Sequence, residues 1–284
     1  MSAKLSSGGL PAAGRSLRWV WALCLWTTAC GHEATAPPAP PDRYDLTFDN
    51  AWGIYETRVD TVRVWPVMQD TLTSYYVSWA PDGRSVVFTR EYGVSSGRYG
   101  LVIYHTIDSS EFALTPGTDE YYPAWSPDGS RIAYLSSGAL HSIRPDGTGD
   151  QQLGSALYFP DPPKWSPDGR ELAATRDDLE IVVVDATTGL EVRSIAPGEG
   201  LSWSPDGRHI AYATAPGLAI ADTDGTNARV IPISSCRDPA WSPDGDWIAV
   251  NNGSGIQVVP ANATSSTSFR FIAPYNGPAW RLRQ

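Results

Sequence analysis

Two short segments have residue types and spacings that could support chemistry. Gly93–Gly97 reads GVSSG and fits the G-x-S-x-G pattern, in which a serine nucleophile occupies a sharp turn between a strand and a helix. The following residues, RYGLVIYH, predict a strand instead, so Ser95 lacks the helix that this chemistry needs. The segment DTDGT (222–226) offers carboxylates to calcium, but the twelfth position of such a loop is Ile233, which has no side-chain oxygen. Both segments are predicted to be hairpin turns without catalytic function.

Histidine and cysteine give no metal signature. The four histidines, at positions 32, 105, 141 and 209, have no partner at the spacing of metal ligands. Of the three cysteines, Cys24 and Cys30 belong to the N-terminal apolar segment, so Cys236 alone remains in the body of the chain and no disulfide framework is possible there. The sequence predicts no catalytic residues, no metal and no other cofactor.

The dominant feature is a repeat that opens with tryptophan. Successive copies are separated by 46, 40, 38, 38 and 39 residues, a period typical of propeller blades with four strands each. We expect these residues to be structural, each indole filling the space between neighbouring blades. They are Trp79, Trp125, Trp165, Trp203, Trp241 and Trp280.

The copy at residues 121–136 shows why the unit forms a hairpin. Pro127 presets a φ near −65° in the turn SPDG, Asp128 bonds local amides, and Gly129 takes a left-handed conformation. The return strand SRIAYLS has adjacent apolar residues, which predicts a strand covered on both faces. A second hairpin follows in each copy, so each unit has four strands.

The chain ends predict how the ring closes. Residues 277–284 supply an opening strand without a return strand, while residues 44–66 supply three strands without an opening one. Together they form one blade, which removes exposed sheet edges. The predicted fold is an all-β, six-bladed β-propeller of four-stranded blades over residues 44–284.

The segment YYPAWSPDGSRIAY resembles the repeat of the TolB-type six-bladed β-propeller family, whose repeats are also described as WD-like. The resemblance covers residues 44–284. It implies an envelope module that binds other proteins. The additional N-terminal α/β domain of TolB has no counterpart between residue 43 and the first predicted strand.

The first 43 residues predict export. Residues 1–29 combine three basic residues, the apolar core WVWALCLW and small residues, which is the layout of a secretory signal and is too short to span a bilayer. LWTTACG resembles a bacterial lipoprotein signal, which implies lipidation of Cys30; an ordinary signal peptide cut nearby is the alternative. Residues 30–43 are a Pro-rich tether. The expected location is the cell envelope of a bacterium (periplasm or outer membrane), with the protein attached to the membrane through the lipid.

Charge argues against nucleic acid as a partner. The formal charge is −10, and without residues 1–29 it is −13, because three of the 21 basic residues and none of the 31 acidic ones lie there. A surface this negative repels phosphate backbones. We expect a monomer that binds another envelope protein or peptide.

The candidate binding residues precede each repeated tryptophan, where the copies differ from one another and the first strand of a blade borders the channel. Tyrosine mixed with a few charges is a composition typical of interfaces, although some of these tyrosines could instead pack under loops. The candidates are Tyr75, Tyr76, Glu120, Tyr121, Tyr122, Tyr158, Phe159, Asp161, Glu199, Arg237, Asp238, Tyr275 and Asn276.

The leading hypothesis is a non-enzymatic propeller that binds a protein or peptide at the channel mouth. Two alternatives remain open at this point. One is a propeller enzyme, a hydrolase or lyase acting on carbohydrate or peptide, which would need a metal-bound histidine or paired carboxylates in the channel. The other is a sensor of glycans or small ligands, for which aromatic platforms at the mouth would also serve.

Overall fold

The computed structural model describes residues 44–50, 53–58, 64–69, 74–93, 97–157, 161–264, 269–270 and 276–282. The predicted signal segment and tether, with Cys30, lie outside these residues, as does Ser95. The described residues form strands and connecting turns. No helix among them is long and apolar enough to cross a membrane.

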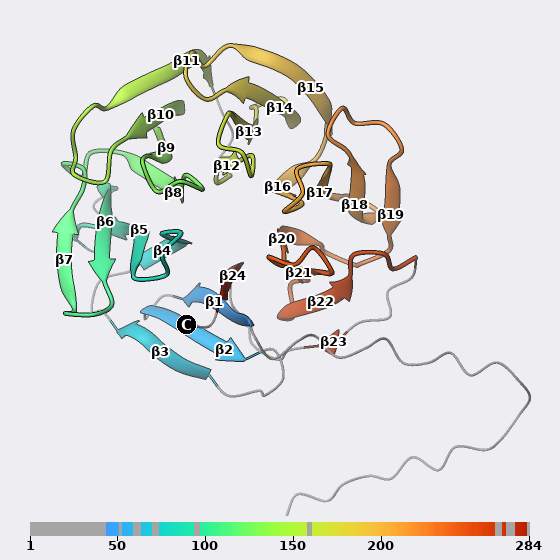
Figure 1. Ribbon diagram of the computed structural model, residues 1–284, viewed down its shortest axis with the longest axis horizontal. Coiled ribbons are helices and arrows are strands. Elements are labelled where there is room, and N and C mark those ends of the chain that lie inside the picture. Colours follow the sequence, from blue (N-terminus) through green and yellow to red (C-terminus); the bar gives the residue numbers. More distant parts are fainter. Residues whose placement is uncertain are drawn as a thin grey trace, which may run out of the picture. The chain divides into compact units, whose positions relative to one another are not determined.

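The strands form six four-stranded antiparallel sheets arranged as blades around a centre (Figure 1). Blade 1 contains β24 (Asn276–Leu282), β1 (Tyr44–Asn50), β2 (Gly53–Arg58) and β3 (Val64–Gln69). Blade 2 contains β4 (Ser74–Trp79), β5 (Ser85–Glu91), β6 (Tyr99–His105) and β7 (Ser110–Ala113). Blade 3 contains β8 (Glu120–Trp125), β9 (Ile132–Ser136), β10 (Ala139–Ile143) and β11 (Gln151–Leu157).

The remaining blades follow in chain order. Blade 4 contains β12 (Lys164–Trp165), β13 (Glu171–Thr175), β14 (Glu180–Asp185) and β15 (Glu191–Pro197). Blade 5 contains β16 (Glu199–Trp203), β17 (His209–Thr214), β18 (Gly217–Asp222) and β19 (Arg229–Ile231). Blade 6 contains β20 (Arg237–Trp241), β21 (Trp247–Asn251), β22 (Ile256–Pro260) and β23 (Phe269–Arg270). The predicted six-bladed propeller is confirmed.

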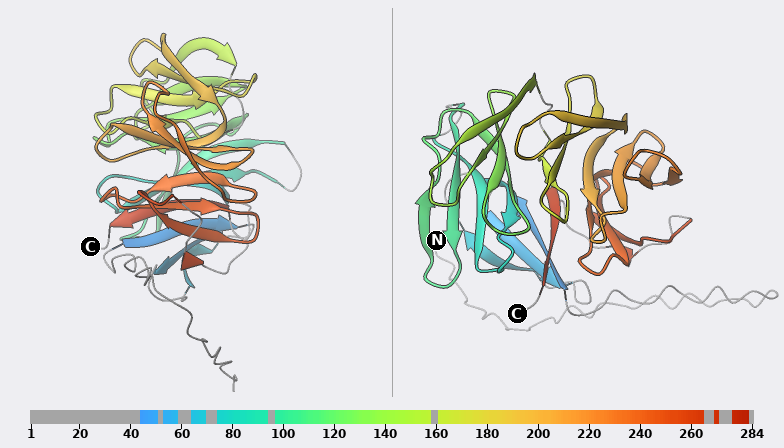
Figure 2. Two further views of the ribbon diagram at one scale, coloured as in Figure 1. Left: turned by 90° about the vertical axis from the view of Figure 1, so that its right-hand side faces the viewer. Right: turned by 45° about the horizontal axis from the view of Figure 1, so that its top comes forward.

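The ring closes as the sequence predicted. The last strand, β24, pairs antiparallel with the first, β1, placing Tyr44 opposite Leu282 and Leu46 opposite Trp280. The first strand of every other blade, and β24 in blade 1, lies next to the centre (Figure 1). The side views show strands running across the thickness of the ring (Figure 2).

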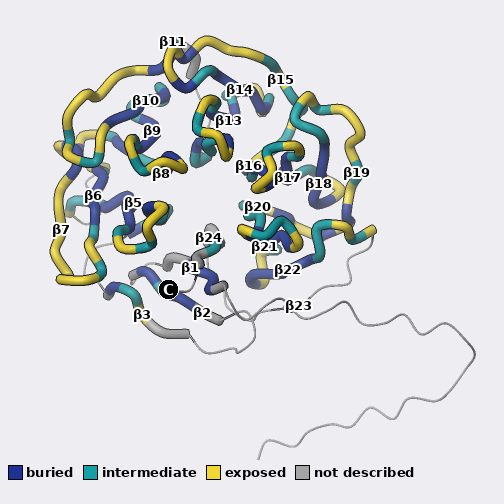
Figure 3. The backbone as a smooth tube through the Cα atoms, in the orientation of Figure 1, coloured by how far each residue is buried: buried dark blue, intermediate teal, exposed yellow. Residues whose placement is uncertain are grey.

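Apolar contacts between blades make up the core. The middle strands are buried on both faces, as the burial of five consecutive residues in β5 shows, and the exposed residues lie mainly in turns and outer strands (Figure 3). One cluster joins Leu135 and Leu140 of blade 3 to Leu172 and Val182 of blade 4. No blade could cover both of its faces alone, which explains why the chain repeats the unit.

The Ser-Pro-Asp-Gly turns lie on one face of the ring, here named the turn face, where each turn contacts the turn of the preceding blade. In the turn of blade 3, the amide of Gly129 donates to the carbonyl of Ser126 at 2.9 Å, and Gly129 has a φ of 72°. The Ser126 hydroxyl donates to Asp128 at 2.7 Å, and this bond is the main cause of the lowered pKa of Asp128. The space beside Gly129 is filled by Pro81 of the preceding blade, 3.6 Å from where a Cβ would lie. Each turn is therefore stabilised by its own hydrogen bonds and by packing against the turn of the adjacent blade.

Candidate functional site

A central cavity of about 550 Å³ lies among the inner strands β4, β8, β12, β16, β20 and β24. Tryptophan and proline side chains line it toward the turn face. At the other end lie the residues third before each repeated tryptophan, and this end is here named the variable mouth. Its members in four blades are Tyr76, Tyr122, Gly200 and Asp238.

These four residues share an unusual backbone conformation. Tyr76, Tyr122 and Asp238 have φ values of 55°, 58° and 48°, and Gly200 has 49°. At each of them the pairing of the inner strand with its neighbour shifts register, as in a β-bulge. A left-handed conformation is unfavourable for residues other than glycine, and such strain clusters at functional sites. The ring therefore holds two tyrosines and one aspartate in a conformation that glycine would adopt more easily.

Five tyrosines form a continuous aromatic group on the blade 2 and blade 3 side of the mouth. The ring centroids of Tyr76 and Tyr122 are 4.2 Å apart, those of Tyr75 and Tyr76 6.1 Å, and those of Tyr121 and Tyr122 6.0 Å. The fifth member, Tyr99 of β6, lies 4.9 Å from Tyr121. Tyr99 was not predicted, because it belongs to another strand of the blade and only the fold brings it to the mouth.

The hydroxyls of Tyr121 and Tyr122 have raised pKa values and remain protonated at neutral pH. Burial is the main cause of the raised pKa of Tyr122, followed by the hydroxyl contact with Tyr76 (3.4 Å) and the negative charges of Asp161 and Asp238. Burial and a hydrogen bond donated to Asp119 raise the pKa of Tyr121. The negative charges of Asp161 in blade 4 and Asp238 in blade 6 therefore act on Tyr122, and Tyr121 and Tyr122 are neutral groups.

Carboxylates lie on the blade 4 and blade 6 parts of the mouth. Asp161 accepts a hydrogen bond from the amide of Gly200 at 2.8 Å and another from the Thr175 hydroxyl at 3.3 Å, so it joins blade 4 to blade 5. A Cβ on Gly200 would lie 3.2 Å from the amide nitrogen of Asp238, which explains why glycine is suited to this position. Asp238 lines the cavity. The variable mouth is therefore aromatic at blades 2 and 3 and acidic at blades 4 and 6.

Lys164, which sequence reasoning missed, also lines the cavity. It is half-buried, and the exposed part of its surface faces this cavity. Burial lowers its pKa from the ordinary value of lysine, while the charges of Asp238 and Asp161 oppose the shift. Comparing the residues directly before each tryptophan would have revealed it, because the other five positions carry only serine or alanine.

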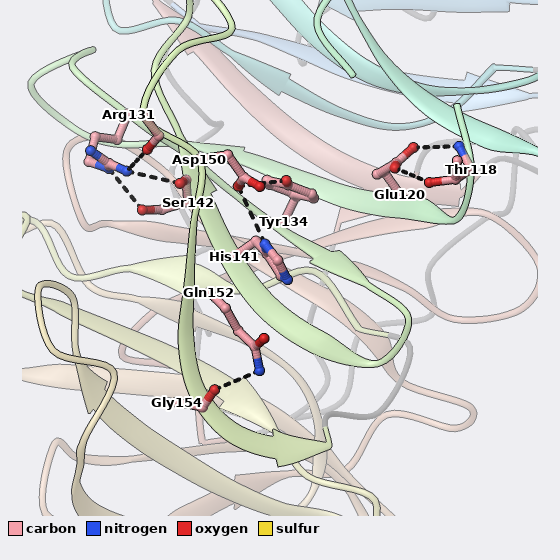
Figure 4. Close-up of polar contacts among 10 residues, drawn as sticks. Thr118, Glu120, Arg131, Tyr134, His141, Ser142, Asp150, Gln152 and Gly154 are labelled. Carbon is pink, nitrogen blue, oxygen red and sulfur yellow. Dashed lines mark hydrogen bonds and ion pairs between the residues drawn. The ribbon is translucent and has the colours of Figure 1, made fainter. Parts of the chain in front are cut away.

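The other predicted site residues are placed differently. Glu120 is buried, and its carboxylate accepts a hydrogen bond from the amide of Thr118 at 2.9 Å (Figure 4). It accepts another from the Thr115 hydroxyl at 3.2 Å. It therefore holds the adjoining loop. Glu199 and Arg237 are exposed. The residues that lie outside the described part of the chain, or of which only the backbone is described, are Tyr158, Phe159, Tyr275 and Asn276.

The six repeated tryptophans pack between blades and also line the cavity. Trp203 is buried and the other five are half-buried. The sequence predicted that these tryptophans pack between blades; it did not predict that they also line the cavity.

Indole hydrogen bonds join adjacent blades. Trp165 donates from Nε1 to the carbonyl of Ala124 at 2.9 Å, and Trp203 donates to the carbonyl of Lys164 at 3.1 Å. Trp280 donates likewise to the carbonyl of Ala240 at 2.9 Å. The same inter-blade contact thus occurs at three of the six repeated tryptophans. Trp79 donates instead to the hydroxyl of Thr47 at 2.9 Å, and the indole N–H groups of Trp125 and Trp241 have no acceptor among the described residues.

A second cavity, of about 580 Å³, lies between blades 5 and 6 near the turn face. Its main polar groups already have partners. Arg229 donates to the carbonyls of Ala261 and Ala263, and Asp206 accepts from Ser204 at 2.6 Å. This cavity offers a ligand fewer free polar groups than the central one.

The three histidines in the described part of the chain lie away from the central cavity. His141 contacts Asp150 at 3.3 Å, and Asp150 also accepts a hydrogen bond from Tyr134 at 2.8 Å, toward the outer part of blade 3 (Figure 4). His105 bonds Ser85 at 2.8 Å, and His209 lies 3.4 Å from Asp222. Within the described ranges, no three His, Cys, Asp or Glu residues are grouped so that they could hold a metal ion.

Comparison with known proteins shows the fold. No protein-family model matches the chain, and no curated protein matches it in sequence. The chain is similar to TolB from Acinetobacter baumannii, with a TM-score of 0.70 and 16% identity over 85% of this chain and 68% of that one. A protein described as TolB from Agrobacterium tumefaciens gives 0.55 and 22%, over 78% and 79% of the two chains. An oligogalacturonate lyase in complex with manganese gives 0.54 and 15%, over 72% and 70%. These likenesses show the propeller fold alone, and the six blades of this chain are those of its own sheets.

Proposed function

We propose that this protein is a non-enzymatic binding module of the bacterial cell envelope, and that its partner, another envelope protein or a peptide, binds at the variable mouth. The observation that carries the proposal is the strained conformation of Tyr76, Tyr122 and Asp238 at one repeated position. Strain of this kind costs on the order of 1 to 3 kcal/mol per residue. A binding role for these side chains accounts for their presence where glycine would fit better.

The composition of the mouth supports a protein or peptide ligand. Tyrosine provides a large contact area with a polar tip and loses little rotamer entropy on binding. The fold similarity to TolB proteins agrees with this function. Because a structurally similar protein is an oligogalacturonate lyase, the enzyme alternative is retained. None of the three described histidines lines the central cavity. The strained backbone and the tyrosine group at the mouth support the binding role.

The rim tyrosines provide the test of this function. We expect the double variant Tyr75→Ala and Tyr121→Ala to lose a stoichiometric partner that the wild type captures from solubilised envelope, because both half-buried side chains belong to the aromatic group. The matched control is Phe112→Ala, which removes an exposed aromatic side chain from the outer strand β7. The readout is a pull-down with quantitative mass spectrometry. Equal capture by the wild type and the double variant would contradict the proposal.

We further propose that the chain is exported and held at the membrane by a lipid on Cys30, with residues 30–43 as the tether. The expected result is that the mature protein begins at Cys30 and has the mass of an acylated N-terminus, and that Cys30→Ser yields no acylated form. Intact-mass spectrometry of the purified protein checks this. A mature chain that begins elsewhere and has no added mass would support the ordinary signal peptide instead.

A further inference from the structure

One charged side chain enters the central cavity at a level where the other blades have small residues. The residue directly before the repeated tryptophan is Lys164 in blade 4. The equivalent residues are Ser78, Ala124, Ser202, Ala240 and Ala279. Lys164 is thus the one long side chain in this ring of six positions.

The small polar residues of this ring are used for blade packing. Ser78 Oγ accepts a hydrogen bond from the amide of Trp125 at 3.0 Å, and Ser202 Oγ accepts one from the amide of Trp241 at 3.0 Å. The carbonyl of Lys164 accepts from the indole of Trp203. The ammonium of Lys164, by contrast, forms no hydrogen bond or ion pair with any residue in the described part of the chain.

The Lys164 nitrogen is not among the fully buried polar atoms of the described residues, so it is accessible from the cavity, where no atom of those residues accepts a hydrogen bond from it. Asp238 and Asp161 act on Lys164 through their charges, and Asp161 already accepts two hydrogen bonds. An oxygen atom supplied by a bound molecule would give the ammonium the acceptor that it lacks. The walls of the same cavity, built from tryptophan and proline, suit the apolar parts of a peptide.

We propose that Lys164 anchors the bound partner by donating a hydrogen bond to an oxygen atom of a peptide side chain that enters the central cavity. This inference rests on the proposed function, since it names the residue and the ligand chemistry of the same site. The oxygen belongs to an amide or to a carboxylate. A cationic tip is repelled by Lys164, and the charges of Asp161 and Asp238 reduce the advantage of a carboxylate over an amide.

Blocked tripeptides of the form acetyl-Gly-X-Gly-amide test the proposal, with X as glutamine, glutamate, norleucine or lysine. Norleucine has the four-carbon chain of lysine without the ammonium and provides no side-chain oxygen. Binding is followed by the fluorescence of the tryptophans that line the cavity. The protein variant is Lys164→Met, which keeps an aliphatic side chain and removes the ammonium.

The wild type is expected to bind the glutamine or the glutamate peptide at least about tenfold more tightly than the norleucine and lysine peptides, the size expected of one hydrogen bond to a charged group. Lys164→Met is expected to lose this preference while its affinity for the norleucine peptide stays unchanged. Its melting temperature is expected to equal or exceed that of the wild type, because a cation without an acceptor has been removed. If Lys164→Met does not fold, Lys164→Leu, which also has no side-chain hydrogen-bond donor, serves in its place, with a similar loss of discrimination expected.

Three results would overturn the proposal: tightest binding of the lysine peptide, a preference that survives loss of the ammonium, or no binding of any tripeptide to the wild type. The pull-down with the rim tyrosine variant is independent of these outcomes. A partner captured equally by the wild type and Lys164→Met overturns the role of Lys164 and leaves the proposed function in place. Binding of the glutamine or glutamate peptide that depends on Lys164, without any captured protein, supports the anchor and contradicts the protein partner.

Discussion

Deletion of residues 276–284 is expected to abolish the cooperative fold and to yield aggregated chain. The deletion removes β24, the inner strand of blade 1, which pairs with β1 along its length. It also removes Trp280, which packs on Leu46 and Trp247 and donates a hydrogen bond to Ala240 of blade 6. Loss of one such indole costs roughly 3 to 5 kcal/mol, and the strand pairing is lost in addition. A typical domain has a total stability of about 5 to 15 kcal/mol.

Gel filtration and thermal unfolding followed by circular dichroism measure this effect. The control is a circular permutant in which residues 276–284 precede residue 44 through a short linker, since Tyr44 and Leu282 are paired neighbours. The permutant contains the same residues as the native arrangement and is expected to unfold cooperatively as a monomer. A truncated chain that remained monomeric, with an unchanged melting temperature, would show that the ring does not depend on this closure.

Trp203→Ala is expected to lower the free energy of unfolding by about 3 to 5 kcal/mol. The indole is buried between Ile181 and Val183 of blade 4 and Ile210 of blade 5. It also donates a hydrogen bond to the carbonyl of Lys164 and lies 6.0 Å from the guanidinium of Arg193. Removing it leaves a cavity at a blade interface and an unsatisfied carbonyl.

Urea denaturation gives the size of this loss. Val230→Ala, which shortens an exposed side chain on the outer strand β19, is the matched control and is expected to change stability by less than about 0.5 kcal/mol. Trp203→Phe keeps an aromatic ring without the indole N–H and is expected to fall between the two. A loss below about 1 kcal/mol for Trp203→Ala would mean that the repeated tryptophans are not what joins the blades.

The features of the fold that depend on repetition could be predicted from the sequence. The period of the tryptophans, the Pro-Asp-Gly turns and the two incomplete units at the chain ends were sufficient for six blades and for closure by β24. These features are either local to one hairpin or repeated in each copy, so the interpretation of one repeat applies to all six blades. Spatial order around the ring then follows chain order.

The site was predictable only in part, since it depends on contacts between blades. Nothing local to Tyr76, Tyr122 or Asp238 shows that the backbone is left-handed there. Glu120 was predicted to be a binding residue, but its carboxylate accepts hydrogen bonds from two threonines of the preceding loop, Thr115 and Thr118. Tyr99 reaches the mouth from another strand of its blade. Lys164 was not predicted because the candidate residues lie three to seven positions before a repeated tryptophan, whereas Lys164 stands directly before Trp165.

The measurement that tests the central claim most directly is photo-crosslinking from the variable mouth in intact cells. A photoreactive phenylalanine derivative replaces Tyr76, which lines the cavity, or, in a control protein, Phe112 on the outer strand β7. The proposed function predicts that the position-76 protein crosslinks to one envelope protein or peptide and that the position-112 protein does not. A crosslink from position 112 to such a partner, with none from position 76, would contradict binding at the mouth.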